Sequence, residues 1–333
     1  MTRRVFFLGA GFSKAVDAQY PLLNELTRDI DSYFEKGSLS KHYRTEVTPA
    51  LKTNVEHLLT FLSTDLPWKT DAQLGTDRAL YHEITNQIQS RLQEIGKKQL
   101  VTGNNVSEFF DNAIKEPQNV SFITLNYDLL LEELINSAYK KAGKEINISD
   151  LYNYPMTWIG MRKFDGVAMF GTDLEKYVPN VIKLHGSINW YWGGASSSEM
   201  IYYQSLDDVH KIEEYDNQLF KSGLNPYIIP PIMDKNAFYN HIMIKQLWKT
   251  AKKLLREANE VYIIGFSMPQ SDLSVRFLFQ SVFENCGAKV FVVNRDNKNN
   301  LLKNYRGVFP CEPDFQYTGS EDVVESLFKR LLK

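Results

Sequence analysis

The sequence predicts an α/β protein with a Rossmann-like, mostly parallel sheet and helices on both faces. Short apolar runs typical of buried strands recur along the chain, helical segments separate them, and each run leads into small or polar residues. Parallel neighbours need crossover connections of helical length, and the intervening segments supply these. The five expected strands span residues 3–8, 120–125, 181–184, 260–264 and 289–293.

Helical patterns fill most of the remaining chain. A helix is expected to begin near Ser13, directly after the first strand and its glycine turn. From 22 to 114 the apolar spacing is helical, and we interpret this region as a helical insertion. Further helices are expected at 129–142, 236–258 and 320–332. The aromatic-rich region 186–258 is interpreted as a small irregular and helical lobe within a single domain spanning 1–333.

Composition excludes several classes of function. The 38 basic and 40 acidic residues give a formal net charge of −2, without a run of five or more like charges, so no nucleic-acid binding is predicted. Cys286 and Cys311 are the two cysteines, which provide neither a disulfide framework nor a CxxC pair for zinc. The amino-terminal apolar stretch is too short for a membrane span. These features predict a cytoplasmic protein that does not associate with membranes.

Polar and small residues follow all five expected strands. In open parallel sheets, ligands bind outside the carboxyl ends of the strands. The sequence therefore predicts one site that collects the five strand ends, which carry Gly9-Ala10-Gly11, Asn126, His185, Gly265-Phe266-Ser267 and Asn294.

The first strand end is a glycine turn that suits a diphosphate. Glycines let the backbone approach the phosphates, and the following helix directs its free amides and positive dipole end toward them. Lys14 stands where the GxGxxG pattern has its third glycine, which disfavours an ordinary dehydrogenase. A tight structural turn remains the alternative interpretation.

The other strand ends offer groups for orienting a substrate and moving protons. Asn126 can orient a ribose or a water, and Asp128 can accept from a carboxamide, although both residues are also common helix caps. His185 suits proton transfer near neutral pH, against the alternative of a structural histidine. Ser267 and Asn294 can bind ribose or phosphate, or can simply form turns.

Taken in order, these segments resemble the sirtuin family, and more closely its bacterial sirtuin-like branch found in antiphage defence than the protein deacetylases. The resemblance runs from the first glycine loop to Asn294. It implies a sirtuin-like fold with NAD as the ligand and assigns Asn126 to the nicotinamide ribose, Asp128 to the carboxamide and His185 to catalysis. It also implies that the phosphates are wrapped by Gly9, Ala10, Gly11, Phe12 and Ser13, and that the ribose and adenine side is lined by Gly265, Ser267 and Asn294.

Two departures separate the chain from ordinary deacetylases. The four zinc-binding cysteines are absent, so neither zinc nor another metal is expected. Tyr20-Pro21-Leu22-Leu23 replaces the family's GIPDFR-type cofactor loop, whose roles therefore cannot be transferred. The resemblance implies an NAD hydrolase that consumes NAD as its substrate and depletes it during abortive infection. An NAD-dependent protein deacylase and a non-catalytic NAD-sensing subunit remain alternatives.

Control of such an activity is expected to come from assembly. We expect a homo-oligomer and a separate activator, for which the resemblance suggests an ATPase or translocase, or an Argonaute-like protein. The insertion at 22–114 and the segment 193–231 are the expected contact surfaces, and residues 227–231 the expected closing loop. Phe12 and Trp190 are expected to exclude water from the site.

Overall fold

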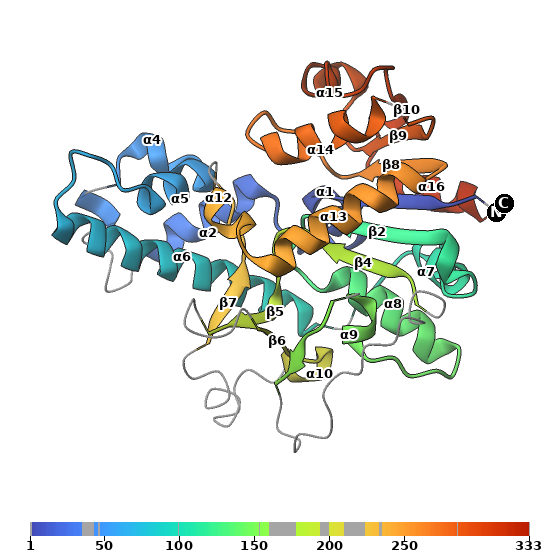
Figure 1. The fold of residues 1–333 in the computed structure, drawn as a ribbon, viewed down its shortest axis with the longest axis horizontal. Helices are drawn as coiled ribbons and strands as arrows, with labels where there is room; N and C mark the ends of the chain where they lie inside the picture. Colours follow the sequence, from blue (N-terminus) through green and yellow to red (C-terminus); the bar gives the residue numbers. More distant parts are fainter. Residues whose placement is uncertain are drawn as a thin grey trace.

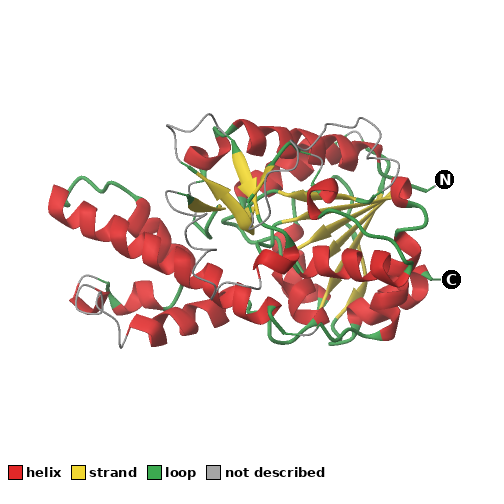
Figure 2. Ribbon diagram, turned by 90° about the horizontal axis from the view of Figure 1, so that it is seen from below, coloured by secondary structure: helices red, strands yellow, loops and turns green. Residues whose placement is uncertain are grey.

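A six-stranded parallel sheet forms the centre of the protein (Figures 1 and 2). The computed structural model describes residues 2–34, 43–45, 47–98, 100–152, 154–159, 178–193, 200–209, 224–232, 235–284 and 286–332. In the order β10-β9-β8-β1-β2-β4, the strands are Asp314–Thr318, Lys289–Asn294, Glu260–Ile264, Arg4–Leu8, Val120–Thr124 and Asn180–Lys183. The expected α/β class and parallel sheet are confirmed.

The order of the strands reverses beside β1. The chain passes from β1 to β2 and β4 on one side, then crosses to β8, β9 and β10 on the other. Leu8 pairs with Ile264 on β8 and with Thr124 on β2, so three strands end at the same level. In open α/β sheets a ligand crevice forms at such a reversal. The glycine turns after β1 and β8 therefore lie where the topology favours a ligand.

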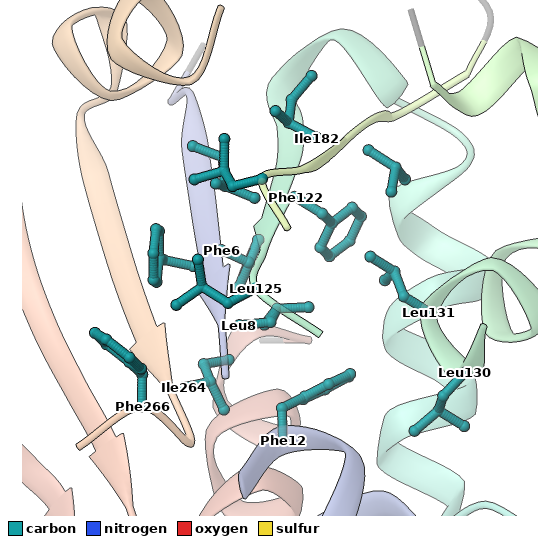
Figure 3. Close-up of a cluster of buried hydrophobic side chains, with 14 of the residues drawn as sticks. Phe6, Leu8, Phe12, Phe122, Leu125, Leu130, Leu131, Ile182, Ile264 and Phe266 are labelled. Carbon is teal, nitrogen blue, oxygen red and sulfur yellow. The ribbon is translucent and has the colours of Figure 1, made fainter. Parts of the chain in front are cut away.

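Helices cover both faces of this sheet (Figure 2). The expected helices on both faces are confirmed. α7 packs against both α8 and α16, and apolar side chains such as Phe6 and Phe122 fill the space beneath (Figure 3). The helices next to the sheet are α1 (Ala10–Val16), α7 (Asn104–Ala113), α8 (Leu130–Lys141), α13 (Ile242–Glu257), α14 (Leu273–Phe283), α15 (Lys298–Tyr305) and α16 (Val323–Leu331), and a 3-10 turn, Pro117–Asn119, precedes β2.

A group of helices extends away from the sheet, at the left of Figure 1. They are α2 (Leu23–Phe34), α4 (Pro49–Lys52), α5 (Val55–Ser63) and α6 (Asp71–Gly96). Asn54 caps α5, because its side chain accepts from the amides of Glu56 and His57. Thr70 and Gln73 form a reciprocal capping box that starts α6. These helices occupy most of the region interpreted as the helical insertion.

Three strands of a second, four-stranded sheet lie within 186–258, the region interpreted from the sequence as irregular, and the fourth, β3 (Thr157–Trp158), precedes that region. The order of this sheet is β3-β6-β5-β7, from Thr157–Trp158, Ile201–Tyr203, Gly186–Trp192 and Asn225–Ile228, with β5 antiparallel to both neighbours. Short helices accompany it: α9 (Ile148–Leu151), α10 (Leu206–Val209) and α12 (Asn236–Tyr239). Residues 194–199 and 210–223 of the expected contact segment lie outside the described residues.

Two local expectations are wrong, and one strand was not predicted. α1 begins at Ala10 rather than near Ser13. The single helix expected at 236–258 is two, because the side chain of His241 accepts from the Met243 amide and caps α13. The sixth strand, β10, was not predicted, since it is an edge strand with exposed Asp314 and Gln316. In the described part of the chain, every helix is too short or too polar to cross a membrane.

Candidate active site

A cavity of about 650 Å³ opens at the carboxyl ends of the central strands. Its size falls within the range of small-molecule and cofactor pockets. All five predicted strand ends contribute to its wall, through Gly9, Ala10, Gly11, Ser13, Asn126, Asp128, His185, Gly265, Ser267 and Asn294. The structure therefore brings together residues that are up to 285 positions apart, from Gly9 to Asn294 (294 − 9), around one space.

Phe12 is the one predicted site residue that lies outside this wall. Its side chain is 1% exposed and packs among core residues such as Leu8 and Leu130 (Figure 3). Trp190, on β5 of the small sheet, is equally buried and packs edge-on to Tyr152. Both rings therefore stabilise the core, and the expectation that they shield the site from water is not supported by their positions.

The glycine turns after β1 and β8 interlock. The amide of Gly11 donates to the Gly265 carbonyl at 2.9 Å, and the amide of Gly9 donates to the Ile264 carbonyl at the same distance. A Cβ atom on Gly11 would lie 2.8 Å from both Cα and O of Gly265. Gly265 itself has a φ of +64°, a conformation that side chains disfavour. Packing between the two turns therefore favours glycine at positions 11 and 265, whether or not a ligand binds there.

A hydrogen-bonded chain joins Asn126, Ser13 and Asp128. Asn126 Nδ2 donates to the Gly9 carbonyl and to Ser13 Oγ, both at 3.0 Å, and the Ser13 hydroxyl donates to Asp128 Oδ2 at 2.9 Å. Among the described residues, none donates to Asn126 Oδ1. The amide is thereby fixed with its carbonyl oxygen as an acceptor for a hydroxyl or a water.

Asp128 is a buried carboxylate in the cavity wall. Burial raises its pKa to about 6, although the nearby Lys183 and the hydrogen bond from Ser13 lower it; Glu132 raises it further. Its Oδ1 also accepts from the Leu130 amide at 3.2 Å. At neutral pH the carboxylate form predominates, and it can accept a proton donor of a ligand.

His185 lies in the two-residue connection between β4 and β5 and is 5% exposed. Its backbone is held by the Ile229 amide, which donates to the His185 carbonyl at 2.8 Å. Burial lowers the pKa of the imidazole to about 4, and Lys235 lowers it further, while Asp272 opposes this shift. Nε2 is buried without a hydrogen-bond partner in the described part of the chain. A neutral imidazole with an unpaired nitrogen can accept a proton from a bound ligand or water.

The sequence analysis missed further residues in the wall, among them two pairs of interacting polar side chains. Lys235 and Asp272 form an ion pair at 3.0 Å, and the Ser271 hydroxyl donates to Glu56 Oε2 at 3.2 Å. They come from loops and from α5, and only the tertiary fold brings them together. Ser267 and Asn294 were predicted, and both also make structural hydrogen bonds: the Ser267 carbonyl accepts from the distant Asn304 side chain, and Asn294 Oδ1 accepts from the Asp296 amide in a local turn.

The described residues contain no group of three or more histidine, cysteine, aspartate or glutamate side chains able to hold a metal ion. Cys286 and Cys311 are both free thiols.

Comparison with known proteins gives one family. The model of the SIR2-like domain matches residues 120–309, more than half of the chain, including Asn126, His185 and Asn294. A search of curated proteins finds no match. Among solved structures, the chain is similar to one from a study of the mechanism and regulation of Sir2 enzymes, at 13% identity and a TM-score of 0.44, covering 99% of this chain and 93% of that one. It is also similar to a Sir2 homologue mutant in complex with ADP-ribose, at 14% identity and a TM-score of 0.43, covering 99% of this chain and 91% of that one.

Proposed function

The chain belongs to the SIR2-like domain family, and we propose that it is an NAD glycohydrolase that splits NAD into nicotinamide and ADP-ribose. The observation that carries this proposal is the cavity at the strand ends, whose wall combines Asn126, Asp128 and His185 with the glycine turns. In this proposal the phosphates lie at the Gly9 to Ser13 turn. The adenosine lies toward Gly265, Ser267 and Asn294, and the nicotinamide ribose lies between Asn126 and His185.

The proposed reaction is a hydrolysis at the anomeric carbon. The bond from this carbon to the nicotinamide nitrogen breaks with its electron pair passing to the nitrogen, so neutral nicotinamide leaves and positive charge develops on the ribose. Water then bonds to the anomeric carbon and gives up a proton. NAD and water thus yield nicotinamide, ADP-ribose and one proton.

Each polar residue has a role that follows from its contacts. His185 is neutral at pH 7 and has an unpaired Nε2, so it accepts the proton of the water directly or through a ribose hydroxyl. Asn126 Oδ1 accepts from the water or a ribose hydroxyl and orients it, because both N–H groups already donate to Gly9 and Ser13. The Asp128 carboxylate accepts from the carboxamide NH₂.

Product analysis tests this function. The purified chain is expected to release nicotinamide and ADP-ribose from NAD without an acylated peptide and without added zinc. His185→Ala should abolish release, whereas His82→Ala, which removes an exposed histidine on α6, should leave it unchanged. Acylated ADP-ribose formed only with an acyl-lysine peptide would identify a deacylase, and NAD binding without any product would identify a sensor.

We also propose that the chain is a cytoplasmic, NAD-depleting effector of bacterial antiphage defence, a role that rests on the resemblance described above. In this proposal it works as a homo-oligomer with a separate activator, either an ATPase or translocase, or an Argonaute-like protein. Sedimentation and NAD cleavage should then depend on dilution or on a partner. Cellular NAD should fall after infection with the wild type and not with His185→Ala. A monomer that is fully active at every dilution and gains nothing from any partner would refute this part.

A further inference from the structure

Two oppositely charged side chains lie buried behind Asp128, and the proposed reaction does not use them. Lys183 is the last residue of β4 and Glu132 lies in the first turn of α8; their side chains are 1% and 0% exposed. Lys183 Nζ lies 2.9 Å from Glu132 Oε1 and donates to the main-chain oxygen of Asp128 at 2.5 Å. The ammonium thus contacts the same residue whose carboxylate lines the cavity.

This arrangement is poorly explained by stability alone. A fully buried ion pair gains little over apolar residues of similar size, because both charges lose their hydration. The hydroxyl of Tyr152 donates to Glu132 Oε1 at 3.1 Å, but Glu132 Oε2 is buried without a hydrogen-bond partner among the described residues. Buried charges that are incompletely satisfied and adjacent to a site are typical of functional positions.

We propose that Lys183 and Glu132 are positioning residues that act through Asp128, holding its main chain in place and setting the charge that its side chain presents to the substrate. The proposal rests on the proposed function, since it takes Asp128 as the group that binds the carboxamide. Lys183 and Glu132 themselves do not line the cavity.

The charges of Lys183 and Glu132 predict in which direction each substitution shifts the titration of Asp128. One ammonium stands with two carboxylates, so the group carries an excess negative charge when all three are ionised. Lys183 lowers the pKa of Asp128 and Glu132 raises it. Removing one or the other should therefore shift the titration of Asp128 in opposite directions. If the pair merely fastened α8 to β4, either removal would lower stability without this opposition.

The experiment compares Glu132→Gln, Lys183→Met and the double variant in the full chain. The first readout is the titration of the Asp128 carboxyl carbon by NMR, assigned by the signal lost in Asp128→Asn, and it needs no turnover. The second is the acid limb of kcat/KM for nicotinamide release from NAD. Glu132→Gln should move both to lower pH and Lys183→Met to higher pH, by about one unit each, as expected for a neighbouring charge.

The double variant covers the case in which Lys183→Met fails to fold, since it removes both charges of the buried ion pair and does not leave Glu132 without its ammonium partner. Its Asp128 should titrate above the wild type, because Lys183 has the larger effect of the two. Shifts in the same direction, or an unchanged titration in all variants, would overturn the proposal. Opposite NMR shifts in a chain that never cleaves NAD would instead refute the proposed function while leaving the coupling to Asp128 intact.

Discussion

The Ser13 hydroxyl donates to Asp128 Oδ2 at 2.9 Å and accepts from Asn126 Nδ2 at 3.0 Å, so the first turn of α1 and the end of β2 share one buried hydroxyl. Ser13 is 2% exposed. Its position explains why the two strand ends act as a unit: the hydroxyl fixes the amide plane of Asn126 and keeps one oxygen of Asp128 hydrogen-bonded.

Ser13→Ala is the first prediction. Losing the hydroxyl removes a hydrogen bond that lowers the pKa of Asp128 and frees one N–H of Asn126. We expect kcat/KM for NAD at pH 7 to fall about tenfold and the unfolding free energy to fall by about 1 kcal/mol, a typical value for one hydrogen bond. Steady-state kinetics and urea denaturation measure the two effects. If the Ser13→Ala variant has the same kinetic constants as the wild type at pH 6 and at pH 7, the hydroxyl does not organise the site.

Asn126→Ala is expected to lower kcat by about two to four orders of magnitude, as for a residue that positions the reacting water. The matched control is Asn112→Ala, which removes an exposed asparagine on α7 and should leave the rate unchanged. Circular dichroism of both variants should match the wild type. Full activity in a folded Asn126→Ala variant would show that Asn126 has only a structural role, as helix-capping residues often do.

The pH dependence of catalysis should follow Asp128 rather than His185. The pKa of His185 is about 4 and that of Asp128 about 6, so on acidification the carboxylate is lost while the imidazole is still neutral. We expect kcat/KM to fall as the pH drops below about 6, and this limb to disappear in Asp128→Asn, which should be slow at every pH. A limb that persists unchanged in Asp128→Asn would assign it to another group.

The unfolding free energy should also depend on pH through Asp128 and His185, and the two residues should affect it in opposite directions. The folded pKa of Asp128 is raised from 3.8, so its contribution is present below pH 3.8 and is lost as the pH rises through 6, by about 3 kcal/mol. The folded pKa of His185 is depressed from 6.5, so its contribution is present above pH 6.5 and is lost as the pH falls through 4. Asp128→Asn should therefore gain stability relative to the wild type between pH 4 and pH 7. Parallel curves of unfolding free energy against pH for the two proteins would contradict this.

Gly11→Val should destabilise the fold as well as weaken NAD binding. The added Cβ would lie 2.8 Å from the Gly265 backbone, so the two interlocked turns must separate. Gly75→Ala is the control: in α6 its Cβ meets nothing within 4 Å, and alanine should raise the stability of this helix by about 0.5 to 1 kcal/mol. Thermal denaturation and calorimetric titration with NAD separate the two effects. A Gly11→Val variant with a wild-type Tm would show that the turns are not tightly packed.

The sequence was most informative where strands are buried on both faces. Val120–Thr124 and Glu260–Ile264 are buried, mostly apolar runs, and the small or polar residues that follow them mark the sheet edge where ligands bind. β10 alternates at the sheet edge and was missed. Once α1 is known to begin at Ala10, Phe12 faces the core, which an expected start near Ser13 could not reveal.

Residues that reach the site through tertiary packing left weaker signs. Lys235 and Asp272 meet through a contact between separate segments, which no local pattern encodes. Lys183 is recognisable in the sequence, because a lysine inside the apolar run Val181-Ile182-Lys183-Leu184 conflicts with a buried strand unless a partner of opposite charge is buried with it. Its partner, Glu132, was hidden within the amphipathic pattern of α8.

Hydrolysis of the nicotinamide–ribose bond is tested most directly by incubating one preparation, with and without the proposed activator, in parallel with NAD and with NADH. In NAD the ring bonded to the ribose is a pyridinium cation, which leaves readily as neutral nicotinamide, whereas the reduced ring of NADH would have to leave as an anion. We predict equal amounts of nicotinamide and ADP-ribose from NAD, with NADH left largely uncut. Equal cleavage of both dinucleotides, or intact NAD under every condition, would contradict the proposed chemistry.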